Sequence, residues 1–93
     1  MPVLTKTEIE TFLKTASDWK IDGGKLVRNW SFRDFADAMI FVNRVAVLAE
    51  SSNHHPDIDI RYNQVQLGLI SHDAGGITDR DRRMAEALNR EFD

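Results

Sequence analysis

Residues 57–70 read DIDIRYNQVQLGLI. Apolar side chains stand at even positions as far as Tyr62 and at odd positions from Val65, so two alternating runs meet with a change of phase. Alternation with a period of two predicts half-buried strands, and a two-residue hairpin loop produces such a change, because its flanking residues pair on the same face. The stretch therefore predicts an antiparallel hairpin whose loop is Asn63-Gln64, since asparagine tolerates the left-handed backbone that such a loop needs.

A second hairpin is predicted earlier in the chain. Its turn is the stretch 22–25, Asp-Gly-Gly-Lys, where glycine supplies the positive φ of a tight reversal. Alternating apolar residues flank this turn, namely Trp19 and Ile21 before it and Leu26, Trp30 and Phe32 after it. Arg28 falls on the apolar phase of the second strand, which predicts either a bulge there or an arginine that reaches past the sheet edge.

Three helices are expected around these hairpins. Thr5 and Glu8 have the spacing of a capping box, and the apolar stripe that follows is Ile9, Phe12, Leu13 and Ala16. A long central helix, capped by Asp34 or Ser31 and ending at 51–53, carries the stripe Phe35, Met39, Val42, Val45, Ala46 and Ala49. A last helix starts at 78–81 and turns Met84, Ala85 and Leu88 inward.

The predicted order is thus α-β-β-α-β-β-α in a single domain spanning 1–93. We expect an α+β fold, in which a four-stranded antiparallel sheet has three helices packed on one face. The apolar run 65–70 fits either pairing across a sheet edge or burial under a helix. A chain of 93 residues buries only about 60–65% of its unfolded surface, so self-association would stabilise it.

Composition excludes several classes of function. The net charge is -3 without a basic cluster, which argues against direct nucleic-acid binding. The chain has no cysteine, so it forms neither a disulfide nor a thiolate zinc site. No apolar run approaches the roughly 20 residues needed to cross a bilayer, and the N-terminal residues lack a secretory signal, so a cytoplasmic protein without membrane attachment is expected.

The three histidines offer the clearest chemistry. His54 and His55 precede the first strand of the later hairpin, and His72 follows the second, so pairing brings them to one end of the sheet. Imidazole exchanges protons near neutrality, and general acid–base catalysis typically contributes about 10²–10⁴-fold. Carboxylates near them in the sequence are Glu50, Asp57, Asp73 and Asp81.

Other interpretations of these residues stay open. A metal site is one, although His54 and His55 are adjacent, whereas common metal sites space their ligands two to four residues apart. A single histidine at a helix end is usually a surface group or a cap. Asp81 could be an acid favoured by the amide dipoles of a first helical turn, and Glu50 a solvated residue at a helix end.

Three segments together resemble the signature of a known family, the pterin-4a-carbinolamine dehydratases. They are AESSNHHPD at 49–57, YNQV at 62–65 and SHDAGGITDRD at 71–81. The resemblance covers nearly the whole chain, and the three motifs in this order are specific, whereas His-His-Pro alone would be weak.

The resemblance implies dehydration of a 4a-hydroxytetrahydropterin, such as 4a-hydroxytetrahydrobiopterin, to the quinonoid dihydropterin. It implies dimers or tetramers, and a functional link to the aromatic amino-acid hydroxylases that release this substrate. The catalytic residues implied are His54, His55 and His72, with His55 the principal acid/base. Substrate-binding or supporting residues would be Glu50, Pro56, Asp57, Ser71, Asp73 and Asp81, with Glu50 one turn before His54 and close enough to orient a ring. No metal or bound organic cofactor is implied, because the pterin is the substrate.

One departure and two alternative functions follow. Many members carry an aromatic residue shortly after His-His-Pro, whereas this chain has Asp-Ile-Asp-Ile at 57–60, which could alter substrate preference. The chain could instead bind pterin with little turnover. It could also be a protein-interaction module, as in animal members that stabilise dimers of a homeodomain transcription factor.

Overall fold

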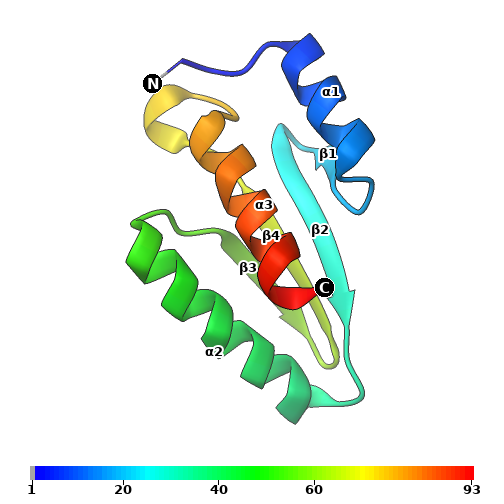
Figure 1. The fold of residues 1–93 in the computed structure, drawn as a ribbon. Coiled ribbons are helices and arrows are strands. Elements are labelled where there is room, and N and C mark those ends of the chain that lie inside the picture. The colour runs from blue at the N-terminus through cyan, green and yellow to red at the C-terminus, as the bar shows by residue number, and fades with distance from the viewer. Residues whose placement is uncertain (1) are drawn as a thin grey trace.

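The computed structural model describes residues 2–93 and contains the predicted order of helices and strands (Figure 1). The elements are α1 (Lys6–Thr15), β1 (Lys20–Asp22), β2 (Lys25–Ser31), α2 (Phe35–Ser52), β3 (Asp57–Arg61), β4 (Gln64–Leu69) and α3 (Asp79–Phe92), with a short 3-10 helix, η1 (His72–Ala74), before α3. The four strands form one antiparallel sheet in the order β1-β2-β4-β3. Figure 1 shows α3 lying over the sheet with α1 and α2 beside it, which confirms the α+β fold.

Strand β4 lies in the interior of the sheet, between β2 and β3. Leu69 pairs with Leu26 of β2, while Leu67 pairs with Ile58 of β3. The side chains of Val65, Leu67 and Leu69 are fully buried and belong to the hydrophobic core. Burial under the helices therefore explains the apolar run 65–70, and edge pairing does not.

The two hairpin turns differ in how well the sequence predicted them. Gly23 and Gly24 have φ of 58° and 79° and connect the paired ends of β1 and β2, as predicted. In the later hairpin Arg61 pairs with Gln64, so the loop is Tyr62-Asn63, one residue earlier than predicted. Phe32, directly after β2, donates through its backbone N to the Asn63 carbonyl oxygen at 2.9 Å, and Asn63 Nδ2 donates to the Phe32 carbonyl oxygen at 2.9 Å. The positive φ of 52° consequently falls on Tyr62.

Arg28 follows neither predicted alternative. The pairing of β2 with β4 is continuous, so the strand has no bulge. The side chain is buried on the helix-covered face, where its guanidinium lies 4.2 Å from the Trp30 ring centroid. It donates to Asn89 Oδ1 at 2.5 Å and to Asp93 Oδ1 at 2.6 Å. Arg28 therefore holds the C-terminal end of α3 against the sheet.

The side chains of the N-terminal caps match the predicted starts of the helices. Thr5 and Glu8 form a capping box on α1, in which the Thr5 backbone N–H donates to the carboxylate of Glu8. This hydrogen bond holds the pKa of Glu8 below its ordinary value. Asp34 caps α2 by accepting from Asp37 N at 2.8 Å, and a second capping box joins Thr78 to Asp81 on α3.

The buried face of α2 was predicted only in part. Val42, Val45 and Ala49 are buried, but Phe35 is 50% exposed and Ala46 is also exposed. Ala38 and Phe41 face the core instead, and the Phe41 ring packs on the rings of Trp30, Phe32 and Phe92. Because most of α2 is apolar on every side, its periodicity does not select a single face.

The stripes of α1 and α3 are confirmed. Phe12 and Ala16 are buried, Ile9 and Leu13 pack against the core, and Met84, Ala85 and Leu88 of α3 are at most 4% exposed. Among residues 2–93, no helix has both the length and the hydropathy that a membrane span requires.

Candidate functional site

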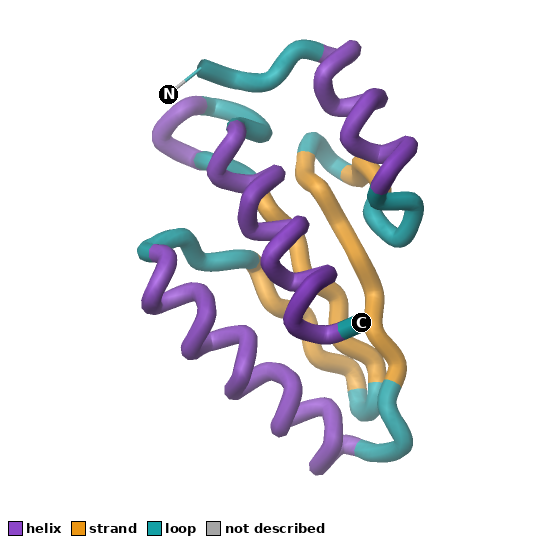
Figure 2. The backbone as a smooth tube through the Cα atoms, viewed as in Figure 1, coloured by secondary structure: helices purple, strands orange, loops and turns teal. Residues whose placement is uncertain are grey.

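The candidate site lies where α2 ends, β3 begins and β4 ends. Asp57, the first residue of β3, pairs with Gly68 near the end of β4, so the segments before Asp57 and after Leu69 leave the sheet at the same end. Figure 2 shows these two loops near the N-terminal end of α3. The structure thus places the segment of His54 and His55 beside the segment of His72.

Asp81 connects these segments through a buried carboxylate. It is fully buried and accepts from the Thr78 backbone N–H at 2.8 Å and from the Ser71 hydroxyl at 2.9 Å, both through Oδ2. Its Oδ1 lies 2.5 Å from His54 Nε2. An ionised carboxylate only accepts hydrogen bonds, so Nε2 of His54 carries the hydrogen and Nδ1 of the neutral ring is left as an acceptor. These donors compensate the cost of burying the charge.

His55 is hydrogen-bonded through Nε2 to Glu50 Oε2. The sequence placed Glu50 close enough to orient a ring; in the structure that ring is His55, while Asp81 holds His54. His55 is 56% exposed and Glu50 78% exposed, so the pair lies at the surface, where a ligand can reach the ring. The carboxylate favours hydrogen on Nε2 and leaves Nδ1 of the neutral ring as an acceptor.

His72 is the least constrained of the three histidines. Its side chain is exposed and makes no hydrogen bond within residues 2–93. Its backbone is well fixed, because Ser71 and Gly76 exchange two backbone hydrogen bonds of 3.0 and 3.3 Å that close the loop around it. Within this loop Gly75 N donates to the His72 carbonyl at 3.2 Å, with Gly75 at a φ of 75°.

Ser71 and Asp73 lie on the same loop and face different surroundings. Ser71 is buried and hydrogen-bonds Thr78 Oγ1 at 2.8 Å in addition to Asp81. Asp73 is exposed and pairs with Arg80 Nη2 at 2.5 Å. That hydrogen bond from Arg80 lowers the pKa of Asp73 below its ordinary value.

Two residues of this site were missed by the sequence reasoning. Thr78 completes the buried network, and the Thr-x-x-Asp spacing of a capping box was a signal that could have identified it. Arg80 was not foreseen, because its partner Asp73 and its position beside His54 depend on how α3 packs. Both His54 and Arg80 line a cavity of about 220 Å³, whose other lining residues are Ser52, Arg83, Met84 and Ala87. Ligand pockets are commonly about 300–1,000 Å³, so this cavity has room for only part of a small molecule.

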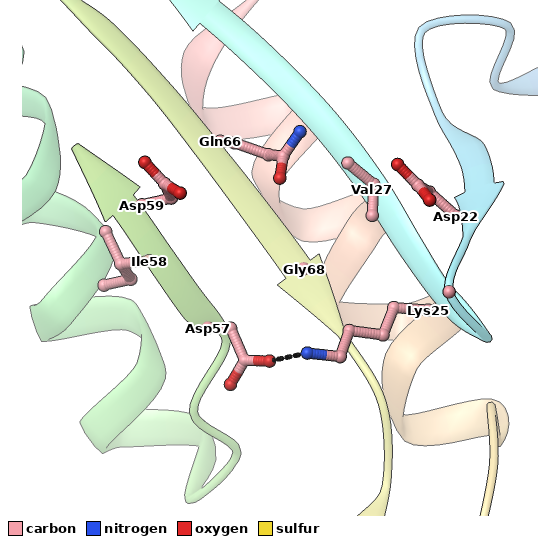
Figure 3. Close-up of a pocket in the computed structure, with 9 residues that line it drawn as sticks. Asp22, Lys25, Val27, Asp57, Ile58, Asp59, Gln66 and Gly68 are labelled. Atoms are coloured by element: carbon pink, nitrogen blue, oxygen red, sulfur yellow. Dashed lines mark hydrogen bonds and ion pairs between the residues drawn. The ribbon is translucent and has the colours of Figure 1, made fainter. Parts of the chain in front are cut away.

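Asp57 is not brought into the histidine cluster. Figure 3 shows its carboxylate on the open face of the sheet, paired with Lys25 across Gly68. A shallow cavity of about 500 Å³ lies on this face, and no histidine lines it. Pro56 is partly buried between His55 and Asp57 and has no polar side-chain atom to offer a ligand.

The carboxylates near the histidines are engaged in hydrogen bonds. Asp81 bonds His54 and Glu50 bonds His55. In the part of the chain that the structure describes, no three histidine or acidic side chains are arranged to hold a metal ion. The geometry is that of two carboxylate-oriented imidazoles and one free imidazole, a set suited to moving protons.

Comparison with known proteins identifies the family. The profile described as "Pterin 4 alpha carbinolamine dehydratase" matches residues 2–91. The chain belongs to this family. A Chloroflexus aurantiacus relative with the provisional name pterin-4-alpha-carbinolamine dehydratase is 46% identical over 89 residues, covering 96% of each chain. A Gloeobacter violaceus relative, provisionally named pterin-4-alpha-carbinolamine dehydratase 2, is 50% identical over 92 residues, covering 95% of this chain and 100% of its own.

Solved structures agree with the family assignment. The crystal structure of a transcriptional coactivator/pterin dehydratase from Brucella melitensis superposes with a TM-score of 0.86 and 33% identity, covering 95% of this chain and 96% of that one. A pterin dehydratase-like protein described as a RuBisCO assembly factor in the alpha-carboxysome has a TM-score of 0.61 and 20% identity, covering 77% of this chain and 83% of its own. The second likeness concerns the fold alone. Members of this fold therefore carry names of both enzymes and assembly factors.

Proposed function

We propose that this chain is an active dehydratase that converts a 4a-hydroxytetrahydropterin into the quinonoid dihydropterin and water. The observation that carries the proposal is the meeting of His54, His55 and His72 at one end of the sheet in a member of this family. Two of the imidazoles have a carboxylate partner, and His55 and His72 are exposed. Such groups supply acid and base near neutral pH.

The leaving hydroxyl needs an acid. The bond between C4a and oxygen breaks more easily when the oxygen receives a proton, because water then leaves in place of hydroxide. His55 is the acid of this proposal, since its ring is exposed and Glu50 holds its Nε2, so the opposite ring nitrogen can face the leaving oxygen. Glu50 acts as the positioning residue for this ring.

The second half of the reaction needs a base. When a base removes the proton from N5, the electrons of the N–H bond stay on N5. They form the new double bond to C4a as the C–O bond breaks. His72 is the base of this proposal, because its ring is exposed and no hydrogen bond occupies it within residues 2–93. One proton is donated to the leaving oxygen and one is removed from N5. The protons therefore balance, and the products are water and the quinonoid dihydropterin.

His54 has a different role in this account. Its Nε2 is held by buried Asp81, and its ring borders the cavity of about 220 Å³ with Arg80. A pterin ring at the mouth of this cavity would contact His54 while the exposed histidines act on its reacting atoms. Asp81 and Ser71 position His54, and the pterin is a substrate that leaves after each turnover, with no resident metal or organic cofactor.

Assembly and cellular role are part of the same proposal. The chain forms a homodimer or homotetramer, since apolar residues such as Ile40 and Val47 are 60% and 71% exposed on α2. Its substrate would be supplied by aromatic amino-acid hydroxylases, which release such carbinolamines. A transcriptional coactivator/pterin dehydratase and a RuBisCO assembly factor share this fold, which favours a second candidate function, in which the chain binds pterin or protein with little turnover.

Turnover and binding measured on one preparation test the proposal. A tetrahydropterin carbinolamine is generated enzymatically, and its decay is followed with and without the protein, while binding of a dihydropterin is titrated separately. We expect faster decay together with saturable binding. Binding without faster decay would favour the second candidate function, and a folded protein that shows neither would exclude a pterin role.

A further inference from the structure

The N-terminal segment lies against the loop that carries His72. Leu4 N donates to the Ile77 carbonyl at 2.8 Å, and Val3 forms an isolated antiparallel bridge with Thr78. Figure 1 shows the start of the chain beside the loop that precedes α3. We call residues 2–5 the N-terminal strap.

The strap packs closely against the loop at Gly76. A Cβ placed on Gly76 would lie 3.0 Å from Cγ1 and 3.3 Å from Cγ2 of Val3, closer than ordinary packing allows. The φ of Gly76 lies outside the left-handed region, so its backbone would accept alanine. A side chain at position 76 would therefore have to displace the side chain of Val3.

Gly76 is directly connected to the backbone beside His72. Its N–H donates to the Ser71 carbonyl at 3.3 Å, and its own carbonyl accepts from Ser71 N at 3.0 Å. No hydrogen bond within residues 2–93 holds the His72 side chain, so the loop backbone alone sets its place. The position of the imidazole therefore depends on how firmly Gly76 is held.

We propose that Val3, acting through Gly76, is a positioning residue for His72. The strap clamps the base of the loop 71–76 and thereby fixes where the His72 imidazole can meet a substrate. This inference rests on the proposed function for the chemistry it serves, but the clamping itself is a property of the loop that is measurable without turnover.

Four variants test the proposal by compensation. Gly76→Ala pushes Val3 outward and should lower kcat by about tenfold, because small displacements of a catalytic group are costly. Val3→Ala in the same chain makes room for the new methyl group, so the double variant should recover most of the loss. Gly68→Ala is the matched control, since a Cβ there meets its neighbours at 3.5 and 3.8 Å, which is ordinary contact. His72→Ala supplies a background in which Gly76→Ala should have no further effect on kcat.

Amide hydrogen exchange measured on the same proteins tests whether the strap holds the loop without relying on turnover. We expect faster exchange at Ser71, Gly76 and Leu4 in Gly76→Ala, with recovery in the double variant and an unchanged unfolding midpoint. Unchanged exchange at these amides would overturn the clamp. An effect of Gly76→Ala on kcat that persists in the His72→Ala background would overturn its action through His72. If the wild type has no turnover, the proposed function fails, while the exchange measurement still decides whether the strap holds the loop.

Discussion

At the residue scale, Asp81 links the stability of the fold to the geometry of the site. Its carboxylate caps α3 through Thr78, holds the Ser71 hydroxyl and fixes the tautomer of His54. The three donors, on Thr78, Ser71 and His54, bond to the two carboxylate oxygens of Asp81. These oxygens are shielded from water, because the residue is fully buried. Replacing this carboxylate therefore affects the start of α3, the loop that carries Ser71 and the His54 ring together.

Asp81→Asn should reduce both stability and activity. An amide has one accepting oxygen, so its NH₂ group faces His54 Nε2, and the buried donors of Ser71 and Thr78 no longer bond to a charge, which costs about 1–3 kcal/mol. The His54 ring then favours the other tautomer, and kcat should fall. Urea unfolding and pterin turnover measure the two effects. Asp79→Asn is the control, since Asp79 pairs with Arg82 and Arg83 near the surface, and it should change neither quantity appreciably.

Local sequence reasoning predicted some residues of the site and could not predict others. The meeting of the histidine segments follows from a hairpin, and a hairpin is visible in alternating residues. The partner of His54 is not local, because Asp81 lies 27 positions away on a helix whose placement depends on the whole core. Asp57 turned to the open face because alternation along β3 places it beside Lys25 and not beside the histidines.

At the element scale, the order of helices and strands was predictable and some finer features were not. The capping box of α1 and the glycine turn between β1 and β2 are local, and the structure contains both where the sequence indicated. The loop between β3 and β4 was misplaced by one residue, because the bonds from Asn63 to Phe32 of the neighbouring segment override its own turn preference. The buried face of α2 depends on aromatic rings from three other segments.

The capping box of α1 should make its stability depend on pH. The pKa of Glu8 is lowered from about 4.5 by the hydrogen bond from Thr5, so its contribution is complete above that value and is lost as the pH falls through the lower folded value. Glu8→Ala should therefore lower the urea midpoint at pH 7 but much less at pH 3. Glu10→Ala, an exposed neighbour outside the cap, should show no such difference. An equal effect of Glu8→Ala at both pH values would contradict the role of the carboxylate.

At the scale of the whole molecule, α2 exposes two large apolar side chains on its outer side. Ile40 and Val47 are seven positions apart, so they lie on one side of the helix. A domain of 93 residues has a limited core, and covering this face would add apolar burial. Self-association through α2 is therefore predicted.

Val47→Glu should lower the mass of the particle in solution. A carboxylate on this face would have to be buried without a partner in an assembled state, so association should weaken by at least tenfold. Light scattering coupled to gel filtration gives the mass, with Ile21→Glu on β1 as the matched control. If the wild type has the mass of one chain at micromolar concentration, the proposed assembly is wrong.

The most direct test of the central claim is the decay of a tetrahydropterin carbinolamine with wild-type protein, with His55→Ala, and with His55→Ala plus free imidazole. Wild-type protein should accelerate the decay, and His55→Ala should lose about 10²-fold or more of that acceleration. Free imidazole should restore part of it, because the exposed position of His55 leaves space for a small base to enter. A folded His55→Ala protein that matches the wild type, or a folded wild type no faster than buffer, would contradict acid–base catalysis by this histidine.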